Sequence, residues 1–147
     1  MKIILGSDHA AFKVKEQIKV FLKGLGHSVT DAGTDSEAPC DYPDIAEKVA
    51  RAVAAGGGDR GVLFDGTGIG MAMTANRVPG ALAATIHDRV TAEMSRKHTN
   101  ANIFCAGAWV LPGGEIESCL KVWLETRFEG GRHDRRIGKI LKLDKKS

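Results

Sequence analysis

The sequence predicts an α/β domain in which helices cover both faces of a doubly wound, five-stranded parallel sheet. Short apolar runs alternate with stretches whose apolar residues recur at helical spacing, which is the pattern of repeated βαβ units. The 147 residues fit one domain, and 43% hydrophobic against 27% charged residues is an ordinary globular composition. We therefore predict a single domain over residues 1–147, with a basic C-terminal tail from about residue 130.

The first half of the chain contains three of the five predicted strands, at residues 3–6, 27–31 and 61–64. The helix between the first two has an apolar face made of Val14, Ile18, Phe21, Leu22 and Leu25. Gly24 and Gly26 end it. A polar loop over residues 32–43 leads to the next helix, where Pro43 suits the first turn. The three glycines at residues 56–58 end that helix.

The second half supplies strands at residues 81–86 and 103–106. A glycine loop follows the third strand directly and opens a short helix through Arg77, after which residues 78–80 form a turn. Another helix runs from Asp88 to His98. The last long helix is marked by Ile116, Leu120, Trp123 and Leu124. The tail past Phe128 has no clear period of its own.

Composition argues against several functional classes. The formal net charge is only +3, and without aromatic interleaving or a recognisable motif the basic tail does not indicate nucleic-acid binding. No apolar stretch approaches the length of a membrane span, so we expect a cytoplasmic protein with no membrane partner. Cys40, Cys105 and Cys119 are too widely spaced for a C-x-x-C metal site. We predict reduced thiols, the last two buried, and no metal.

Candidate functional residues should follow strands, because doubly wound sheets bind ligands at the carboxyl ends of their strands. Asp8 and His9 follow the first predicted strand, residues 65–70 the third, and His87 and Asp88 the fourth. Topology alone thus places three polar groups on one edge of the sheet. The active site is expected there.

The strongest local signal is the loop Asp65-Gly66-Thr67-Gly68-Ile69-Gly70. Successive glycines before a helix free backbone N–H groups to converge on an anion. The loop is not a dinucleotide fingerprint, because residue 71 is Met, and it lacks the G-K-[ST] of a P-loop. NAD and ATP are therefore not expected, and we predict no cofactor. A tight strand-to-helix turn that binds nothing is the alternative.

Asp65 and His98 are the candidate proton-transfer groups. A carboxylate beside glycine amides and the Thr67 hydroxyl suits proton abstraction next to a carbonyl, because the amides can stabilise an enediolate oxygen. His98 could move protons on and off a sugar hydroxyl near neutral pH. The alternatives are a helix N-cap for Asp65 and a helix-dipole partner for His98. Arg132 and Arg136 lie four residues apart and, if helical, could grip a phosphate together; a solvated basic tail is the alternative.

Several motifs in one order resemble the ribose-5-phosphate isomerase type B family, which includes the galactose-6-phosphate isomerase subunits. They are Gly6-Ser7-Asp8-His9, Asp41-Tyr42-Pro43, Gly66-Thr67-Gly68-Ile69-Gly70, Ala75-Asn76-Arg77-Val78-Pro79-Gly80, Ser95-Arg96-Lys97-His98 and Gly130-Gly131-Arg132-His133. The resemblance implies a flavodoxin-like fold and a metal-independent homodimer or homotetramer whose active site is shared between subunits. It also implies aldose-ketose isomerisation of a small phosphorylated sugar through an enediolate, with ribose 5-phosphate as the first substrate to test.

The resemblance also implies roles for individual residues. The sugar site would be lined by Asp8, His9, Tyr42 and Thr67. The amides of residues 66–70 would stabilise the enediolate, and His98 would assist ring opening. The phosphate would be held by His9, Arg132 and Arg136.

The sequence departs from the family pattern at substrate contacts. Asp65 stands where many members have a cysteine base, and Met71 where others have a glutamate. Thr99 replaces an asparagine, and Trp109 stands where a phosphate-binding arginine is common. We expect an altered substrate or reduced activity, so isomerisation of a galactose 6-phosphate-like or tetrose phosphate sugar stays open. A sugar-phosphate or nucleotide binding protein without catalysis, and a basic RNA-associated module, are the competing classes.

Overall fold

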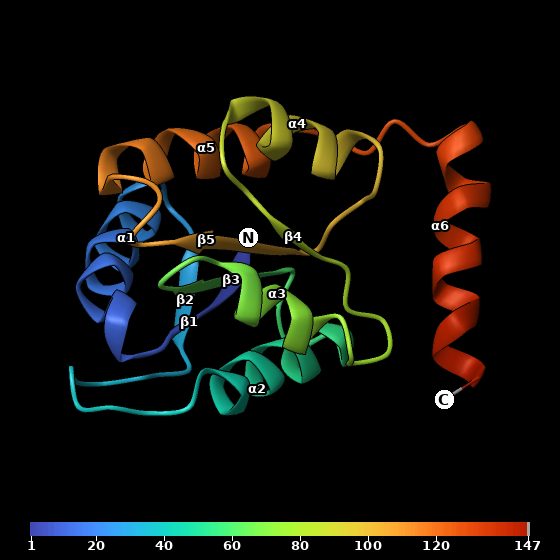
Figure 1. The fold of residues 1–147 in the computed structure, drawn as a ribbon. Helices are drawn as coiled ribbons and strands as arrows, with labels where there is room; N and C mark the ends of the chain where they lie inside the picture. The colour runs from blue at the N-terminus through green and yellow to red at the C-terminus, as the bar shows by residue number, and fades with distance from the viewer. Residues whose placement is uncertain (147) are drawn as a thin grey trace.

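The computed structural model describes residues 1–146, so Ser147, the last residue of the predicted domain, lies outside the described residues. The strands are β1 (Lys2–Ser7), β2 (Ser28–Asp31), β3 (Arg60–Asp65), β4 (Ala83–Thr85) and β5 (Ile103–Gly107). The helices are α1 (Phe12–Gly24), α2 (Tyr42–Ala54), α3 (Ile69–Ala75), α4 (Arg89–Lys97), α5 (Gly113–Glu125) and α6 (Arg132–Leu143), with short 3-10 turns η1 (His9–Ala11) and η2 (Asp144–Lys146). The predicted doubly wound α/β fold is confirmed (Figure 1).

All five strands are parallel, in the order β2-β1-β3-β5-β4. The far edge differs from the flavodoxin order 2-1-3-4-5, because here β5 lies between β3 and β4. This order aligns the carboxyl ends of β3 and β5, where Asp65 pairs in register with Gly107. Segments that follow these two strands therefore meet at one point of the sheet edge.

Helices α1, α4 and α5 cover one face of the sheet and α2 and α3 the other (Figure 1). Side chains alternate between the faces of a strand. Ile3 and Leu5 of β1 accordingly join the core with α1 and α5, while Ile4 joins the core with α2. Because the chain crosses to opposite faces after β1 and β2, the switch point of the topology lies between β1 and β3. The predicted ligand edge therefore coincides with the place where the connections that follow β1 and β2 diverge to opposite faces of the sheet.

The edge strand β4 is shorter than the predicted strand at residues 81–86. Two asparagine side chains replace strand pairing at its start: Asn102 Oδ1 accepts the Leu82 N–H at 2.8 Å, and Asn76 Oδ1 accepts the Ala83 N–H at 2.8 Å. Past the end of β4, the Ile86 N–H still donates to the Cys105 carbonyl. The apolar run predicts the strand correctly, but its limits depend on side chains that are distant in sequence.

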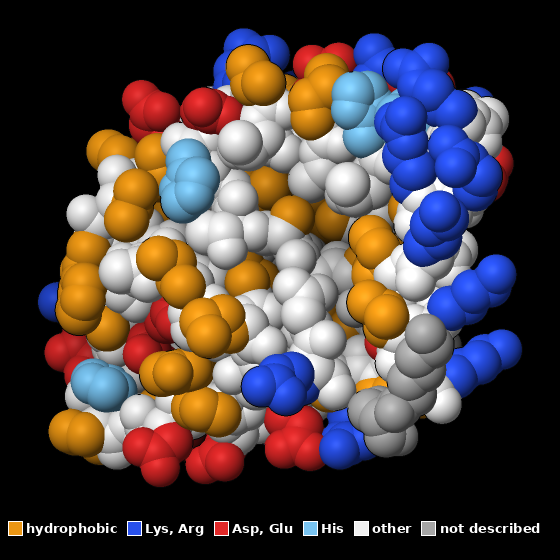
Figure 2. All heavy atoms as spheres, turned by 45° about the vertical axis from the view of Figure 1, so that its right-hand side comes forward, with side chains coloured by type: hydrophobic (Ala, Val, Ile, Leu, Met, Phe, Trp, Pro, Cys, Tyr) orange, Lys and Arg blue, Asp and Glu red, His pale blue; other side chains and the backbone are white. Residues whose placement is uncertain are grey.

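The tail beyond Phe128 forms the helix α6, so the reading of this segment as lacking a period was wrong. His133 and Ile137 are buried and lie four residues apart, and Ile140 and Leu141 continue the spacing. Helix α6 stands beside the three-layer body (Figure 1), and its lysine and arginine side chains form a basic surface (Figure 2). A cavity of about 370 Å³ lies between α6 and the β4 edge. Asp144, which follows α6, links this end of the chain to the turn before β4, since its Oδ2 accepts the Gly80 N–H at 2.9 Å.

The three cysteines are free thiols, as predicted, and Cys105 and Cys119 are buried. Burial raises the pKa of the Cys105 thiol, which therefore stays protonated at neutral pH. Among residues 1–146, no helix combines the length and apolar character that a membrane crossing requires.

Trp123 should be a main determinant of stability. Its side chain is 0% exposed and packs edge-to-face on Phe104 with ring centroids 5.7 Å apart. Trp123→Ala is expected to lower the free energy of unfolding by about 3–5 kcal/mol, because it removes buried apolar area and leaves a cavity. Urea unfolding at fixed protein concentration measures this. Trp109→Ala is the matched control; its indole is 76% exposed, so a change within about 0.5 kcal/mol is expected. Equal losses in both variants would contradict the prediction.

Candidate active site

The glycine loop joins β3 to α3 and is closed by the side chain of Asp65. One oxygen of this carboxylate accepts a short hydrogen bond from the Gly68 N–H, and the other accepts the Met71 N–H at 3.2 Å. Asp65 is only 5% exposed. The N-cap residue of α3 is Gly68 rather than Asp65, but the Asp65 carboxylate accepts N–H groups at the start of this helix, as a turn aspartate does.

A cavity of about 380 Å³ nevertheless opens beside this carboxylate. Its lining brings together seven residues that the sequence placed at the site: Asp8, Tyr42, Asp65, Gly66, Thr67, Gly70 and Trp109. Gly68 lies behind the lining within the same loop, at φ +83°, where a Cβ would meet the backbone of Ala106 at 3.0 Å. The Asp65 carboxylate thus accepts the loop N–H groups and also lines the cavity.

Two aromatic rings form walls of the cavity by packing against glycines. A Cβ on Gly66 would lie 2.6 Å from the Trp109 ring, and a Cβ on Gly70 would lie 2.6 Å from the Tyr42 ring. The Trp109 backbone is held to the loop as well, because its N–H donates to the Gly66 carbonyl at 3.0 Å. The strand order explains this contact, since Trp109 follows β5 and Gly66 follows the neighbouring β3.

Of the two other lining residues, Met73 was not predicted, and Ile69 was predicted only through its backbone amide, within residues 66–70. Both are exposed apolar side chains on α3. Their spacing of four residues puts them on one face of the helix, and an apolar pair at that spacing directly after the glycine loop was the available signal. They add apolar surface to the lining of the cavity.

Asp8 is the second carboxylate of the cavity, at the end of β1. Its Oδ1 accepts the Ala11 N–H at 3.3 Å, and the residue is 7% exposed. Burial raises the pKa of the Asp8 carboxyl above its ordinary value, and the negative charge of Asp65 raises it further, against the lowering effect of the Ala11 bond. Asp8 therefore holds a proton more readily than an ordinary aspartate.

The other predicted site residues do not line this cavity within one chain. His9 turns to Cys40, whose N–H donates to His9 Nδ1 at 3.2 Å. His98 ends α4 and lines a separate hollow together with Thr99. Arg132 and Arg136 lie on α6, as the helical alternative for this pair required, and so share a face of the helix.

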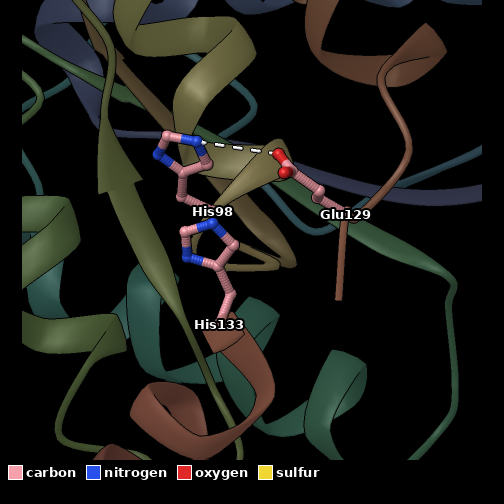
Figure 3. Close-up of side chains that lie close together, drawn as sticks. All are labelled: His98, Glu129 and His133. Atoms are coloured by element: carbon pink, nitrogen blue, oxygen red, sulfur yellow. Dashed lines mark ion pairs between the residues drawn. The ribbon is translucent and has the colours of Figure 1, made fainter. Parts of the chain in front are cut away.

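His98 belongs to a cluster with Glu129 and His133 (Figure 3). Its Nε2 lies 3.8 Å from Glu129 Oε2, and its ring stacks on that of His133 with centroids 4.3 Å apart. The pKa of His133 is lowered by burial first, and then by His98 and the nearby arginines. His133 is therefore neutral at physiological pH.

Replacing Asp8 by asparagine should stabilise the fold at neutral pH. Above the raised pKa of Asp8 the folded protein carries a buried charge that the unfolded chain exposes to water. As pH falls through that pKa toward 3.8, the folded state binds a proton before the unfolded state does, so the wild type gains stability relative to Asp8→Asn. The advantage of the variant is thus present at neutral pH and lost in acid.

Urea unfolding of both proteins from about pH 7 to about pH 4 measures the difference. Asp35→Asn, at an exposed loop position, is the matched control and should differ little from wild type at any pH. A stability difference between Asp8→Asn and wild type that does not change with pH would count against the prediction.

Comparisons with known proteins agree with this arrangement. The Ribose/Galactose Isomerase family model matches residues 3–140. Ribose-5-phosphate isomerase B of Escherichia coli is 36% identical, covering 99% of this chain and 97% of its own length. A D-erythrulose-4-phosphate isomerase of Pectobacterium atrosepticum is 39% identical, covering 95% and 93%.

Solved structures of the same family superpose closely. Ribose-5-phosphate isomerase B of Clostridium thermocellum has 44% identity and a TM-score of 0.98, with 99% of each chain covered. The Mycoplasma genitalium enzyme with bound ribulose-5-phosphate has 38% identity and a TM-score of 0.95, covering 99% of this chain and 97% of its own. The chain belongs to the ribose/galactose isomerase family.

Proposed function

We propose that the protein interconverts an aldose and a ketose phosphate in the cytoplasm, with ribose 5-phosphate and ribulose 5-phosphate as the first pair to test. The observation that carries the proposal is the buried Asp65 carboxylate beside the glycine amides at a cavity of about 380 Å³. Family membership supports the reaction type, and two relatives named as ribose-5-phosphate isomerase B support the substrate. No cofactor is needed for this chemistry, which moves only protons.

Asp65 acts as the base in this proposal. Its carboxylate takes the proton from C2 of the open-chain aldose, and the C–H electrons form the C1–C2 double bond while the π electrons of the C1 carbonyl move to O1, which gives the enediolate. O1 gains the proton that O2 releases, and the proton on Asp65 is delivered to C1 as the C2–O2 bond becomes the ketose carbonyl. A carboxylate has about four lone-pair sites, and the Gly68 and Met71 amides occupy two of them. These two bonds fix the orientation of the carboxylate and leave lone pairs for the substrate.

The enediolate oxygens would be stabilised by the loop amides and the Thr67 hydroxyl. Such donors act most strongly when they are already oriented before the charge develops. Thr67 Oγ1 itself accepts the Ile69 N–H at 3.2 Å, so its own proton is free to point toward an oxyanion. Asp8, with its raised pKa, can exchange hydrogen bonds with a sugar hydroxyl in either protonation state.

The phosphate group requires a partner that one chain does not provide. None of the described residues that line the cavity is cationic, and two of them are carboxylates. A phosphate dianion would be repelled there. We propose that a second copy of the chain completes each site in a homodimer, contributing His98, Thr99, Arg132 and Arg136. The exposed apolar residues of α6, Ile140, Leu141 and Leu143, support the same assembly.

Trp109 favours a second candidate, a shorter phosphorylated sugar. Its indole stands over Gly66 at the cavity wall, where it takes up space and offers an apolar face rather than a charge. The relative named as a D-erythrulose-4-phosphate isomerase shows that this family includes a tetrose phosphate enzyme. A screen of tetrose, pentose and hexose phosphates by NMR would distinguish the substrates through exchange of the C2 proton.

Asp65→Asn should lower kcat for the preferred substrate by about 100-fold or more, because the amide cannot accept the C2 proton. With a substrate deuterated at C2, NMR measures this step directly as loss of deuterium from C2 to the solvent. The asparagine keeps one oxygen that can accept the Gly68 N–H, so substrate binding and folding should be retained. Calorimetry checks the binding and circular dichroism checks the folding. Undiminished turnover would remove Asp65 from the mechanism. Saturable binding by wild type without any exchange would instead identify a sugar-phosphate binding protein.

Mixing Asp65→Asn with His98→Asn should restore activity if sites are shared between subunits. Random reassortment makes half of the molecules mixed dimers, each with one intact site, so recovery to about a quarter of wild-type activity is expected. The measurement is isomerase activity before and after subunit exchange, with exchange verified by mass spectrometry of the dimers. An inactive mixture in which mixed dimers are present would show that Asp65 and His98 act in the same chain.

A further inference from the structure

The cluster of His98, Glu129 and His133 has the composition of a metal site. One ligand atom from each residue lies within 4.8 Å of the other two. Two imidazoles and a carboxylate are a common zinc donor set that leaves a fourth position for water. Figure 3 shows the three side chains converging from the end of α4, the segment after α5 and the start of α6.

The backbone holds the cluster in place. The Glu129 N–H donates to the Lys97 carbonyl at 3.0 Å, which ties Glu129 to the residue before His98. Gly130 and Gly131 follow with φ values of +69° and +59°. This sharp turn starts α6 and brings His133 back against His98, since the His133 N–H donates to the Gly130 carbonyl at 3.1 Å. The convergence is therefore a feature of the fold rather than of mobile side chains.

A second observation points independently to a ligand. His133 is 4% exposed, and within the described part of the chain its buried Nε2 has no hydrogen-bond partner. A buried polar atom without a partner is costly, and such atoms in native structures call for an explanation. A neutral imidazole nitrogen with a free lone pair is also the form in which histidine binds metals.

A zinc ion fits after the His98 ring turns out of the stack, because imidazole lone pairs lie in the ring plane and two rings inclined by only 13° cannot both point at one ion. Zinc–ligand bonds of about 2.0–2.1 Å in a tetrahedral site place ligand atoms about 3.3 Å apart, compared with separations of up to 4.8 Å in the unliganded cluster. Glu129 and His98 are partly exposed, so they have room to move. Arg132 and Arg136 act against a cation here, because their charges reach His133. Glu129 supplies a negative charge that opposes them.

We propose that His98, Glu129 and His133 form a zinc site whose occupancy inhibits the enzyme. The ion takes the lone pair of His98, so the imidazole can no longer move a proton at the sugar ring. The inhibitory consequence rests on the proposed role of His98 in isomerisation. The binding site itself rests only on the geometry of the three side chains.

Cobalt(II) titration of the assembled protein, stripped of metals by a chelator, tests the site without reference to activity. One equivalent per chain should produce the visible bands of four-coordinate cobalt, and Zn²⁺ should displace it. Glu129→Gln and His133→Asn should each weaken Zn²⁺ binding by about 10-fold or more. His87→Asn and Glu125→Gln, exposed residues of the same types outside the cluster, are matched controls and should bind as wild type does.

Activity measurements test the inhibition. Zn²⁺ should inhibit wild type and both control variants, with recovery on addition of chelator. Glu129→Gln should keep its metal-free turnover within about threefold, because an exposed ion pair contributes little, and should lose the inhibition.

The two parts of the proposal fail separately. A cobalt spectrum unchanged by Glu129→Gln and His133→Asn would overturn the site. Zinc binding at the cluster without inhibition of an active enzyme would overturn the inhibitory role. If the protein proves to have no isomerase activity, the cobalt spectrum still decides whether the site exists.

Discussion

The hydrogen bonds from the loop amides to Asp65 are the contacts on which the site depends. The chain passes from β3 to α3 in three residues, and in that turn Gly68 approaches the backbone of Ala106 too closely for a side chain. A turn this tight leaves N–H groups pointing inward. The Asp65 carboxylate satisfies two of them and at the same time faces the cavity. Capping and chemistry, which the sequence presents as alternatives, are therefore compatible in one side chain.

Charge is distributed unevenly over the molecule, and this asymmetry supports the proposal that two chains share each site. The cavity carries Asp8 and Asp65, and burial of two carboxylates together raises the pKa of Asp8. The arginines and lysines of α6 lie on a separate surface (Figure 2). In the proposed homodimer, the basic helix of one copy would supply the positive charge that the acidic cavity of the other lacks. A phosphorylated sugar, with hydroxyls at one end and a dianion at the other, matches such a composite site.

The sequence predicts the five strands and the ligand edge because these depend on local apolar runs and on topology. It does not predict that β5 lies beside β3, and so it does not place Trp109 over Gly66, a contact made between segments distant in sequence. The sequence does not predict where β4 starts for the same reason, because the side chains of Asn102 and Asn76 determine it. Helix α6 buries only His133 and Ile137, which is too little apolar signal to distinguish a helix from a solvated tail. The position of His98 away from the cavity depends on how distant elements pack, so no local sequence pattern predicts it.

The cavity's chemistry then constrains what an aspartate base can do. Two backbone amides of the turn between β3 and α3 set the orientation of the Asp65 carboxylate without a second side chain. The rings of Tyr42 and Trp109 lie against Gly70 and Gly66 of the loop and thereby limit the space available to a substrate. Under the proposed mechanism, a sugar lies between these two rings with its C2 hydrogen directed at Asp65. The carboxylate then determines the reaction type, and the indole of Trp109 bears on the length of the sugar that fits.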